Sequence, residues 1–447
     1  MTSSRVVLLL DGRSLERENT SYRSMKPLNH SGIWTHRCRH RAHTARIAKE
    51  TSGVYAAEWS NSHNIHDGVH PRSRDRRENG SHTRYTLVSI NRGCQGYQHV
   101  GLGYEKRTRS WTNRTHPSKT TLRLPSDLFF QPVPPGLESI DLPIYCFLIS
   151  NGNRHVLFDL GVRKDWESYS PSMVSLIQSI SEVHSPTNIS EILDANSKST
   201  GITSRDIEAV IWSHQHFDHI GDVTTFPPST ELVVGPGVRD LCVPGYPTKP
   251  DAMILEADLA GRCVREASFD QECLRIGRFK AYDFFGDGSF YLLDAPGHCP
   301  GHLCGFARVT SSEDSTSSSF IFMGADACHH AGILRPTKNH PLPSSFPMDI
   351  IRIHREIRPN SLHEPFFVQS QKLFPHYEQA VETVRNIQDL DALENVFVIL
   401  AHDGSLREHL TFFPECINDW AANGVKDRTK WLFCENLAWA IGNGKSQ

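Results

Sequence analysis

A group of three histidines and one aspartate within six positions constrains this chain more than any other feature. It follows the apolar run Ile207–Trp212, which is typical of a buried strand. Alternate side chains of an extended backbone point the same way, so His214 and His216 can bind one cation from the same side. Asp218 and His219 lie beyond the turn and can face a second cation close by. Imidazole nitrogen and carboxylate oxygen suit Zn²⁺, and less selectively Mn²⁺ or Fe²⁺.

Three later segments each place a further potential ligand where an apolar run ends. His298 lies in a turn rich in glycine and proline, Asp326 follows the run Phe320–Met323, and His402 follows the run Val396–Leu400. Any one of these residues alone would be interpreted as an ordinary loop residue. Four such strand exits in one chain predict instead a single metal centre built from distant segments.

Regular apolar patterning begins near Leu122. The sequence Asn151-Gly152-Asn153 predicts a tight hairpin, and the segment His376–Leu393 predicts a helix with one apolar face. The polar run Ser311–Ser319 is typical of an exposed hairpin loop. Strands come in runs and helices in separate blocks, which favours two packed sheets with helices outside. The expected strands are 142–149, 155–160, 207–212, 231–234, 279–285, 290–293, 305–309, 320–323 and 396–400.

The first 120 residues differ in composition from the rest. Counting Lys and Arg against Asp and Glu, residues 1–120 carry +12 and residues 121–447 carry -15, which gives the net charge of -3. The first stretch lacks a sustained apolar repeat, so we expect a basic, disordered extension, or sequence that is not part of the working protein. A basic arm that binds nucleic acid is the alternative, although no zinc-finger spacing or recognition helix accompanies the charge. The folded domain is expected over residues 121–447.

Composition excludes several classes of protein. No segment approaches the ~18 consecutive apolar residues that a membrane-spanning helix needs. The apolar run Val6–Leu10 is shorter than the roughly 7–15 residues of a signal-peptide core. The 11 cysteines are odd in number and irregularly spaced, which does not indicate a disulfide framework. We therefore expect a cytoplasmic protein with reduced thiols.

Taken in order, these motifs resemble those of the metallo-β-lactamase superfamily over residues 130–410. The resemblance implies an αββα sandwich, in which two mixed sheets carry helices on their outer faces and a dinuclear metal site lies at one edge. It rests on His214-x-His216-x-Asp218-His219, Pro296-Gly-His298-Cys-Pro-Gly-His302, Gly324-Ala-Asp326 and Ala401-His402-Asp403.

The same resemblance assigns roles to individual residues. One metal would be held by His214, His216 and His298; the other by Asp218, His219 and His402; and Asp326 would bridge the two. The implied cofactor is a pair of Zn²⁺ ions, or of Mn²⁺ or Fe²⁺, which supply a hydroxide that attacks a carbonyl carbon. Asp218 would also orient this hydroxide.

The resemblance also implies roles for His302 and Asp159, and Asp403 is considered because it stands next to His402. His302 would be structural, and Asp159 would support the site from the end of its strand. Asp403 would either accept a hydrogen bond near the metals or be an ordinary loop carboxylate.

Within the superfamily, the motifs are most similar to acyl-homoserine-lactone lactonases and fungal lactamase-like hydrolases. The segment Asp326–Pro336 carries the fungal likeness. This implies opening of a small cyclic amide or ester, in detoxification or secondary metabolism. The alternatives are an esterase or thioesterase, a nucleic-acid-processing hydrolase, or a non-catalytic binding protein. His329 stands where bacterial lactonases have a tyrosine; it would donate a hydrogen bond to the substrate carbonyl, or be a surface or supporting histidine.

Overall fold

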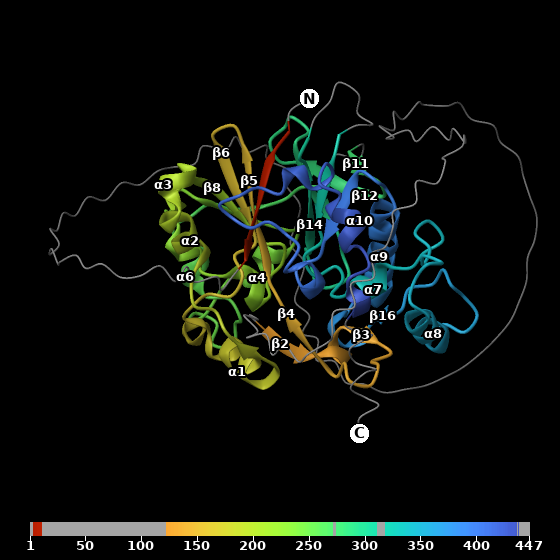
Figure 1. Ribbon diagram of the computed structural model, residues 1–447. Coiled ribbons are helices and arrows are strands. Elements are labelled where there is room, and N and C mark those ends of the chain that lie inside the picture. Colours follow the sequence, from red (N-terminus) through yellow and green to blue (C-terminus); the bar gives the residue numbers. More distant parts are fainter. Residues whose placement is uncertain (1–2, 11–121, 271–273, 311–317, 436, 438–447) are drawn as a thin grey trace, which may run out of the picture. The chain divides into compact units, whose positions relative to one another are not determined.

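Two six-stranded sheets form the framework of the computed structural model, which describes residues 3–10, 122–270, 274–310, 318–435 and 437 (Figure 1). In order across the first sheet are β1 (Arg5–Leu10), β5 (Tyr145–Asn151), β6 (Arg154–Phe158), β8 (Ile207–Ile211), β9 (Glu231–Val234) and β10 (Val264–Glu266). In order across the second sheet are β11 (Arg275–Ile276), β12 (Phe279–Asp283), β13 (Phe290–Asp294), β14 (Leu303–Arg308), β15 (Phe320–Met323) and β17 (Val396–Ile399).

Alternating side chains of the strands build two apolar layers. Phe147 and Ile211 of the first sheet share one core cluster with Leu292 and Ile321 of the second, so this cluster fills the space between the sheets. Each sheet is mixed: β5 and β6 are antiparallel and β6 and β8 parallel, as β14 and β15 are antiparallel and β15 and β17 parallel. Residues of the opposite parity, such as Leu148, point outward into a second cluster.

Helices cover the outer faces of both sheets. Figure 1 shows α2 (Ile189–Ala195) and α3 (Ser197–Thr200) beside the first sheet, and α9 (Tyr377–Asp391) and α10 (Val425–Thr429) beside the second. Helix α9 buries Val384 and Ile387 in the same cluster as Phe322 of β15. The layers therefore stack as helix, sheet, sheet, helix, and the expected αββα sandwich is confirmed. The remaining helices are α1 (Pro171–Ile180), α4 (Phe217–Ile220), α5 (Val238–Cys242), α6 (Glu256–Leu259), α7 (Ala331–Leu334) and α8 (Met348–Ile357).

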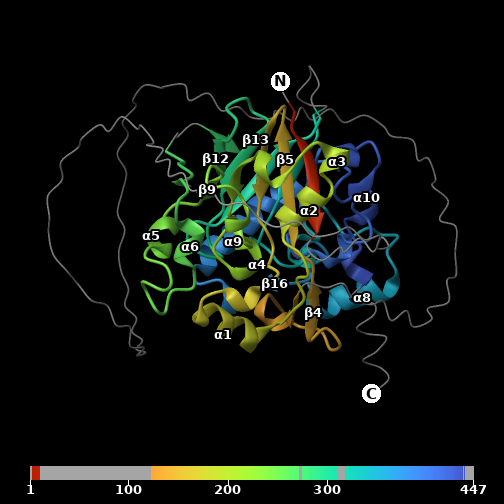
Figure 2. The ribbon, with the colours of Figure 1, turned by 90° about the vertical axis from the view of Figure 1, so that its left-hand side faces the viewer.

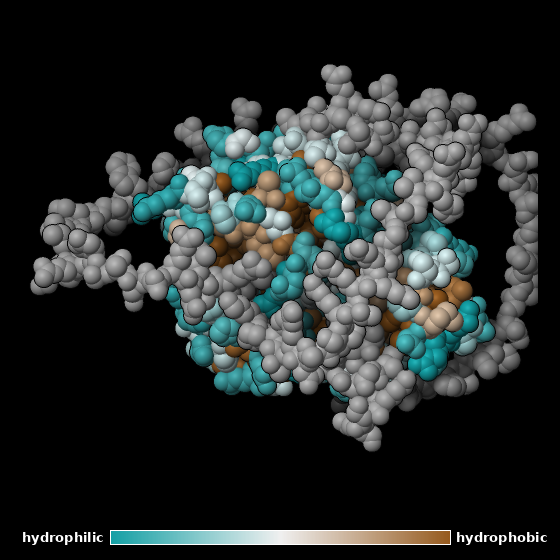
Figure 3. Space-filling model, viewed as in Figure 1, coloured by the Kyte–Doolittle hydropathy of each residue, from teal (hydrophilic) through white to brown (hydrophobic). Residues whose placement is uncertain are grey.

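Two small sheets lie with α1 at one end of the sandwich, at the bottom of Figures 1 and 2. One orders β4 (Ser139–Leu142), β2 (Leu122–Pro125) and β7 (Glu182–Val183); the other pairs β3 (Phe130–Gln131) with β16 (Val368–Gln369). Among the residues that are coloured in Figure 3, polar side chains predominate, with apolar patches between them. One exposed apolar side chain is Met348 at the start of α8, which is 71 % exposed. No helix in the described ranges is long and apolar enough to cross a bilayer.

Most predicted elements are confirmed to within a few residues. The turn at Gly152 joins β5 to β6, and the predicted helix over residues 376–393 is α9. The expected strand over residues 142–149 is instead divided between β4 and β5. Pro143 stands at the break, because proline cannot donate a hydrogen bond to a sheet. The predicted loop over residues 311–319 lies mostly outside the described residues.

The predicted boundary of the folded domain at residue 121 is wrong for one segment. Arg5–Leu10 forms β1, which pairs antiparallel with β5 from Arg5 opposite Ser150 to Leu10 opposite Tyr145. The apolar run that is too short for a signal peptide is therefore a strand buried on both faces. The predictions for residues 11–121, including the disordered extension and the nucleic-acid arm, lie outside the described residues.

Candidate metal centre

The ends of four strands bring all seven predicted metal ligands together at one edge of the sandwich. His214 and His216 follow β8, and the single turn of α4 carries Asp218 and His219. The other three ligands follow β13, β15 and β17. The ligand atoms form two groups, within each of which all atoms lie within 4.8 Å of one another: His214, His216, His298 and Asp326; and Asp218, His219, Asp326 and His402.

Asp326 belongs to both groups, and its two oxygens face different sides. Its Oδ1 lies 3.0 Å from Nε2 of His219 and 2.9 Å from Nε2 of His402. Its Oδ2 lies 3.5 Å from Nε2 of both His214 and His298. One carboxylate therefore lies between two sets of imidazoles, which is the arrangement that a residue bridging two cations requires.

Asp159 fixes the orientation of His219 from behind. Its Oδ2 lies 2.8 Å from Nδ1 of His219, and its Oδ1 accepts a hydrogen bond of 2.7 Å from the backbone N–H of Ser213. Asp159 has a φ of 64°, in the left-handed region that aspartate and asparagine tolerate better than most residues. The predicted supporting role of Asp159 therefore corresponds to a direct contact.

Two further histidines are held in the same way. Nδ1 of His214 lies 2.9 Å from Oγ of Ser213, and Nδ1 of His402 lies 2.9 Å from the carbonyl oxygen of Pro143. A partner on Nδ1 fixes the ring and leaves Nε2 for a metal. In both rings, as in His219, Nε2 is the atom that faces Asp326.

The side chains fit a pair of metal ions in their chemistry as well as their positions. Nε2 of His214, Nε2 of His219 and Oδ1 of Asp326 are buried and lie close to one another without a well-aligned hydrogen bond, which is costly unless something binds them. Burial, reinforced by the neighbouring imidazoles, lowers the pKa of His214 and of His298 well below the usual value. These rings are therefore neutral at physiological pH, the form that binds metals.

The charge of Asp326 follows from its neighbours. Burial by itself would raise the pKa of this carboxyl, but the positive charge on the imidazoles of His219 and His402, whose own pKa the nearby carboxylates raise against the effect of burial, holds the pKa of Asp326 well below its usual range. The carboxylate is therefore ionised, as a metal ligand must be.

His302 and Asp403 lie near the centre but belong to neither ligand group. His302 places Nδ1 3.0 Å from the carbonyl oxygen of Ala295, and its Nε2 accepts a hydrogen bond of 3.2 Å from the backbone N–H of Asp326. It therefore binds the backbone at Asp326, and burial lowers the pKa of His302 to about 3. Asp403 accepts a hydrogen bond of 3.1 Å from the backbone N–H of Ser405, which favours the interpretation as a loop carboxylate.

His329 is buried in the site and is not a surface residue. Its Nε2 lies 3.0 Å from Oδ2 of Asp326. Its ring lies parallel to that of His402, with 4° between the planes and 5.5 Å between the centroids, and 4.6 Å from the ring of Phe129. It is therefore within reach of anything that binds beside Asp326.

A cavity of about 310 Å³ opens onto this centre. Its polar side contains five of the seven predicted ligands together with Gln215 and His329, and these five are His216, Asp218, His298, Asp326 and His402. The sequence did not predict the rest of the wall, because residues that line an apolar cavity follow the same periodicity as residues of a core. Those wall residues are Leu124, Leu128, Phe129, Leu142, Met173, Leu176, Ile180, Phe217, Met253 and Leu373.

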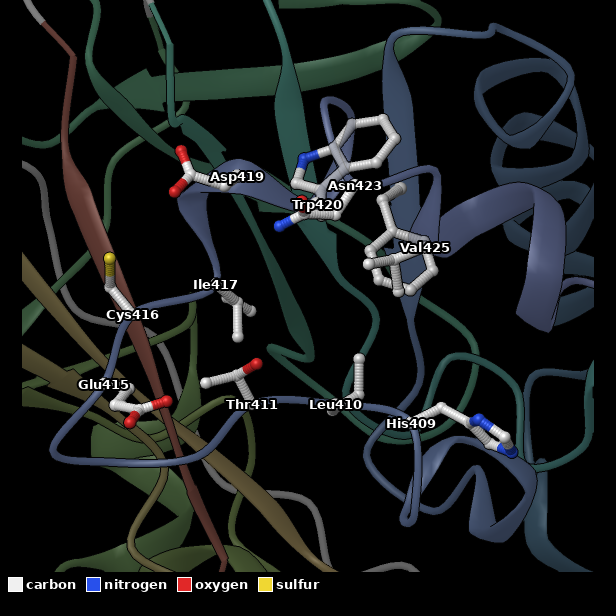
Figure 4. Close-up of a pocket in the computed structure, with 11 residues that line it drawn as sticks. His409, Leu410, Thr411, Glu415, Cys416, Ile417, Asp419, Trp420, Asn423 and Val425 are labelled. Atoms are coloured by element: carbon white, nitrogen blue, oxygen red, sulfur yellow. The ribbon is translucent and has the colours of Figure 1, made fainter.

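A second cavity, of about 220 Å³, lies between β17 and the segment 409–425 (Figure 4). His409 and Glu415 lie at opposite sides of the close-up, and Asp419 lies above Glu415. None of the seven predicted ligands lines it, and its titratable groups form no metal-binding group within the described ranges. The first cavity is therefore the candidate active site.

Comparison with known proteins agrees with this geometry. Residues 140–310 match the family model described as the Metallo-beta-lactamase superfamily. The chain is 49 % identical over 329 residues to metallo-hydrolase mfmC of Annulohypoxylon moriforme, covering 72 % of this chain and 86 % of that protein. It is 37 % identical over 331 residues to gamma-lactamase FDB1 of Fusarium pseudograminearum, covering 70 % and 78 %.

A longer relative is the cytochrome P450 monooxygenase mpaDE of Penicillium roqueforti. The identity is 54 % over 329 residues, which make up 73 % of this chain. The matching part spans only 37 % of the length of mpaDE. With two relatives matched over more than two thirds of their length and two candidate metal sites in place, the chain belongs to the metallo-β-lactamase superfamily of metallo-hydrolases.

Proposed function

We propose that this metallo-hydrolase opens a small cyclic amide or ester, that is, a lactam or a lactone. The observation that carries the proposal is the pair of ligand groups sharing Asp326 at the end of a cavity of about 310 Å³. That volume is near the lower end of the range for small-molecule sites, roughly 300–1,000 Å³, and suits a small molecule better than a polymer. The relative named gamma-lactamase FDB1 supports a cyclic amide as one substrate type.

Two zinc ions held by these groups would lower the pKa of a shared water and polarise a carbonyl oxygen. The surrounding residues then orient the reactants. Asp218 lines the cavity, and its Oδ2 lies 3.5 Å from Nε2 of His402. The carboxylate is thus placed to orient the attacking water and to accept its proton.

His329 supplies the second catalytic group of the proposal. The ring nitrogen Nε2, 3.0 Å from Oδ2 of Asp326, is close enough to donate a hydrogen bond to a substrate oxygen that binds beside this carboxylate. Phe129 packs against the ring and limits its movement, because the two ring centroids are only 4.6 Å apart. The fixed ring would hold its donor in place before the substrate arrives.

The test uses the full chain loaded with zinc and a panel of lactones, γ-lactams, β-lactams, open-chain esters and thioesters. We expect turnover of cyclic amides or esters. We also expect His214→Ala to lose both turnover and bound metal, because a ligand is removed. A preference for open-chain thioesters would favour the thioesterase alternative. Absence of turnover across the panel by protein that holds two metal ions would refute the proposed function.

A further inference from the structure

The wall of the active-site cavity that faces away from the metal groups is apolar. It is built by segments on different elements: β2, the 3₁₀ helices η1 (Ser126–Leu128) and η6 (Gln371–Leu373), β4, α1 and the loops that carry Phe129 and Met253. The side chains concerned are Leu124, Leu128, Phe129, Leu142, Met173, Leu176, Ile180, Met253 and Leu373.

Lysine and arginine are absent from the described lining of this cavity. The two carboxylates of the lining, Asp218 and Asp326, belong to the metal groups. Arg163 is buried behind α4, but its guanidinium is paired with Asp165 at 3.0 Å and with Asp222 at 3.1 Å. An anionic group on the part of a substrate that lies against the apolar wall would therefore meet leucine and methionine side chains, with neither lysine nor arginine to pair with.

We propose, on the basis of the function proposed above, that the substrates are neutral molecules with an apolar body and the reactive carbonyl at one end. The apolar body would lose its contact with water against the leucine and methionine wall, which favours binding. A carboxylate or phosphate on the same body would have to lose its hydration without gaining a partner, which is strongly unfavourable. The cavity therefore selects against anionic lactams, nucleotides and peptide thioesters that carry free carboxylates.

Leu176 offers a direct way to reverse this selection. It lies on α1, lines the cavity and is 38 % exposed, so a longer polar side chain can reach solvent without disturbing the core. Leu176→Arg would place one cation at the rim of the apolar wall. Leu241 on α5 gives a matched control, because it is 55 % exposed and lies outside the cavity lining.

The experiment compares a γ-alkyl-γ-lactone with an analogue of equal length whose chain ends in a carboxylate. We expect wild-type protein to prefer the neutral lactone by roughly 100-fold or more in kcat/KM. Leu176→Arg should raise kcat/KM for the carboxylate analogue by about tenfold at low ionic strength, and less in 0.5 M salt, because salt screens exposed charges. Leu241→Arg should leave both values as in the wild type, and metal content should be the same in all three proteins.

The outcomes separate this inference from the proposed function. Equal turnover of the two lactones by the wild type would overturn the inference while leaving the proposed function intact. If neither lactone is turned over, the same comparison is made with the neutral and carboxylate-bearing forms of whichever cyclic amide or ester of the panel is hydrolysed, and only silence across the whole panel, with metal bound, overturns the proposed function itself. Should Leu176→Arg fail to fold, the wild-type ratio alone decides the inference.

Discussion

Replacing Asp159 with asparagine tests the orientation of the metal ligands without removing any of them. Asparagine tolerates the φ of 64° at this position and has the shape of aspartate. It offers one acceptor in place of two. If its oxygen keeps the bond to the backbone N–H of Ser213, its NH₂ group faces Nδ1 of His219. The imidazole must then accept at Nδ1 and carry its proton on Nε2, which is the atom that faces Asp326 and the metal.

The cost follows from the contact that is lost. The Asp159–His219 contact, at 2.8 Å between buried groups, is a hydrogen bond to a charged group, worth about 1.5–3 kcal/mol. At about 1.4 kcal/mol per tenfold, that corresponds to roughly a 10- to 150-fold loss of affinity. Partners of metal-bound histidines typically contribute about 10–100-fold. We therefore expect Asp159→Asn to weaken one zinc by 10–100-fold and to leave the site of His214, His216 and His298 much less affected.

Competition with a chromophoric chelator measures the two zinc affinities in one titration, and thermal unfolding of the same samples reports on the fold. The matched control is Asp194→Asn, because Asp194 also accepts from a backbone N–H, that of Ser204 at 2.7 Å, but is not part of the metal centre. If Asp159→Asn binds both zinc ions as tightly as the wild type while remaining folded, the assigned role of Asp159 is refuted.

Three further changes test other parts of the structure. Burial raises the pKa of Asp258 to about 7. The folded protein therefore loses stability as the pH rises from about 4 to about 7. In urea unfolding, Asp258→Asn should be the more stable protein at pH 8, by up to about 4 kcal/mol, and should lose this advantage near pH 4. Tyr169 donates a hydrogen bond of 2.8 Å to the carbonyl oxygen of Phe217 at the start of α4. Tyr169→Phe should therefore cost about 1–3 kcal/mol of stability and lower kcat. Unchanged kinetics would contradict a role of Tyr169 in positioning α4. Replacing residues 12–120 with a linker of about eight residues should preserve both the melting temperature and the rate of hydrolysis. Removing residues 1–121 as a whole should instead lower the melting temperature, because this deletion also removes β1.

The residues that come together in the candidate metal centre could be predicted from the sequence because metal-binding chemistry restricts the residue types. His298, Asp326 and His402 each follow an apolar strand, and strand ends are where a sandwich brings distant segments together. The supporting role of Asp159 is predicted only through the family resemblance, and its contact with His219 is seen only in the structure. Which ring nitrogen faces the metal depends on contacts such as that of His402 with Pro143, between residues more than 250 positions apart. No local pattern encodes a contact of that kind.

The cavity wall could not be predicted, for a related reason. Met173 is buried and Leu176 is partly exposed, yet both belong to the apolar pattern of α1. Periodicity shows which side of a helix avoids water, but it does not show whether a core or a substrate lies on that side. The two-residue strands β3 and β16 are likewise too short to leave a pattern.

The strand β1 shows why composition alone misplaced the domain boundary. A strand buried on both faces appears as a short continuous apolar run, which has the same appearance as a truncated signal-peptide core. Its partner β5 begins 135 positions after Leu10, at Tyr145, and Tyr145 lies opposite Leu10. The next described residue after Leu10 is Leu122 of β2, which lies opposite Leu142, three positions before Tyr145. Paired Cα atoms are about 5 Å apart and three residues span at most ~10 Å, so Leu10 and Leu122 lie within roughly 20 Å of each other. About six extended residues cover that distance, and the pairing of β1 with β5 therefore does not depend on the length of chain between them.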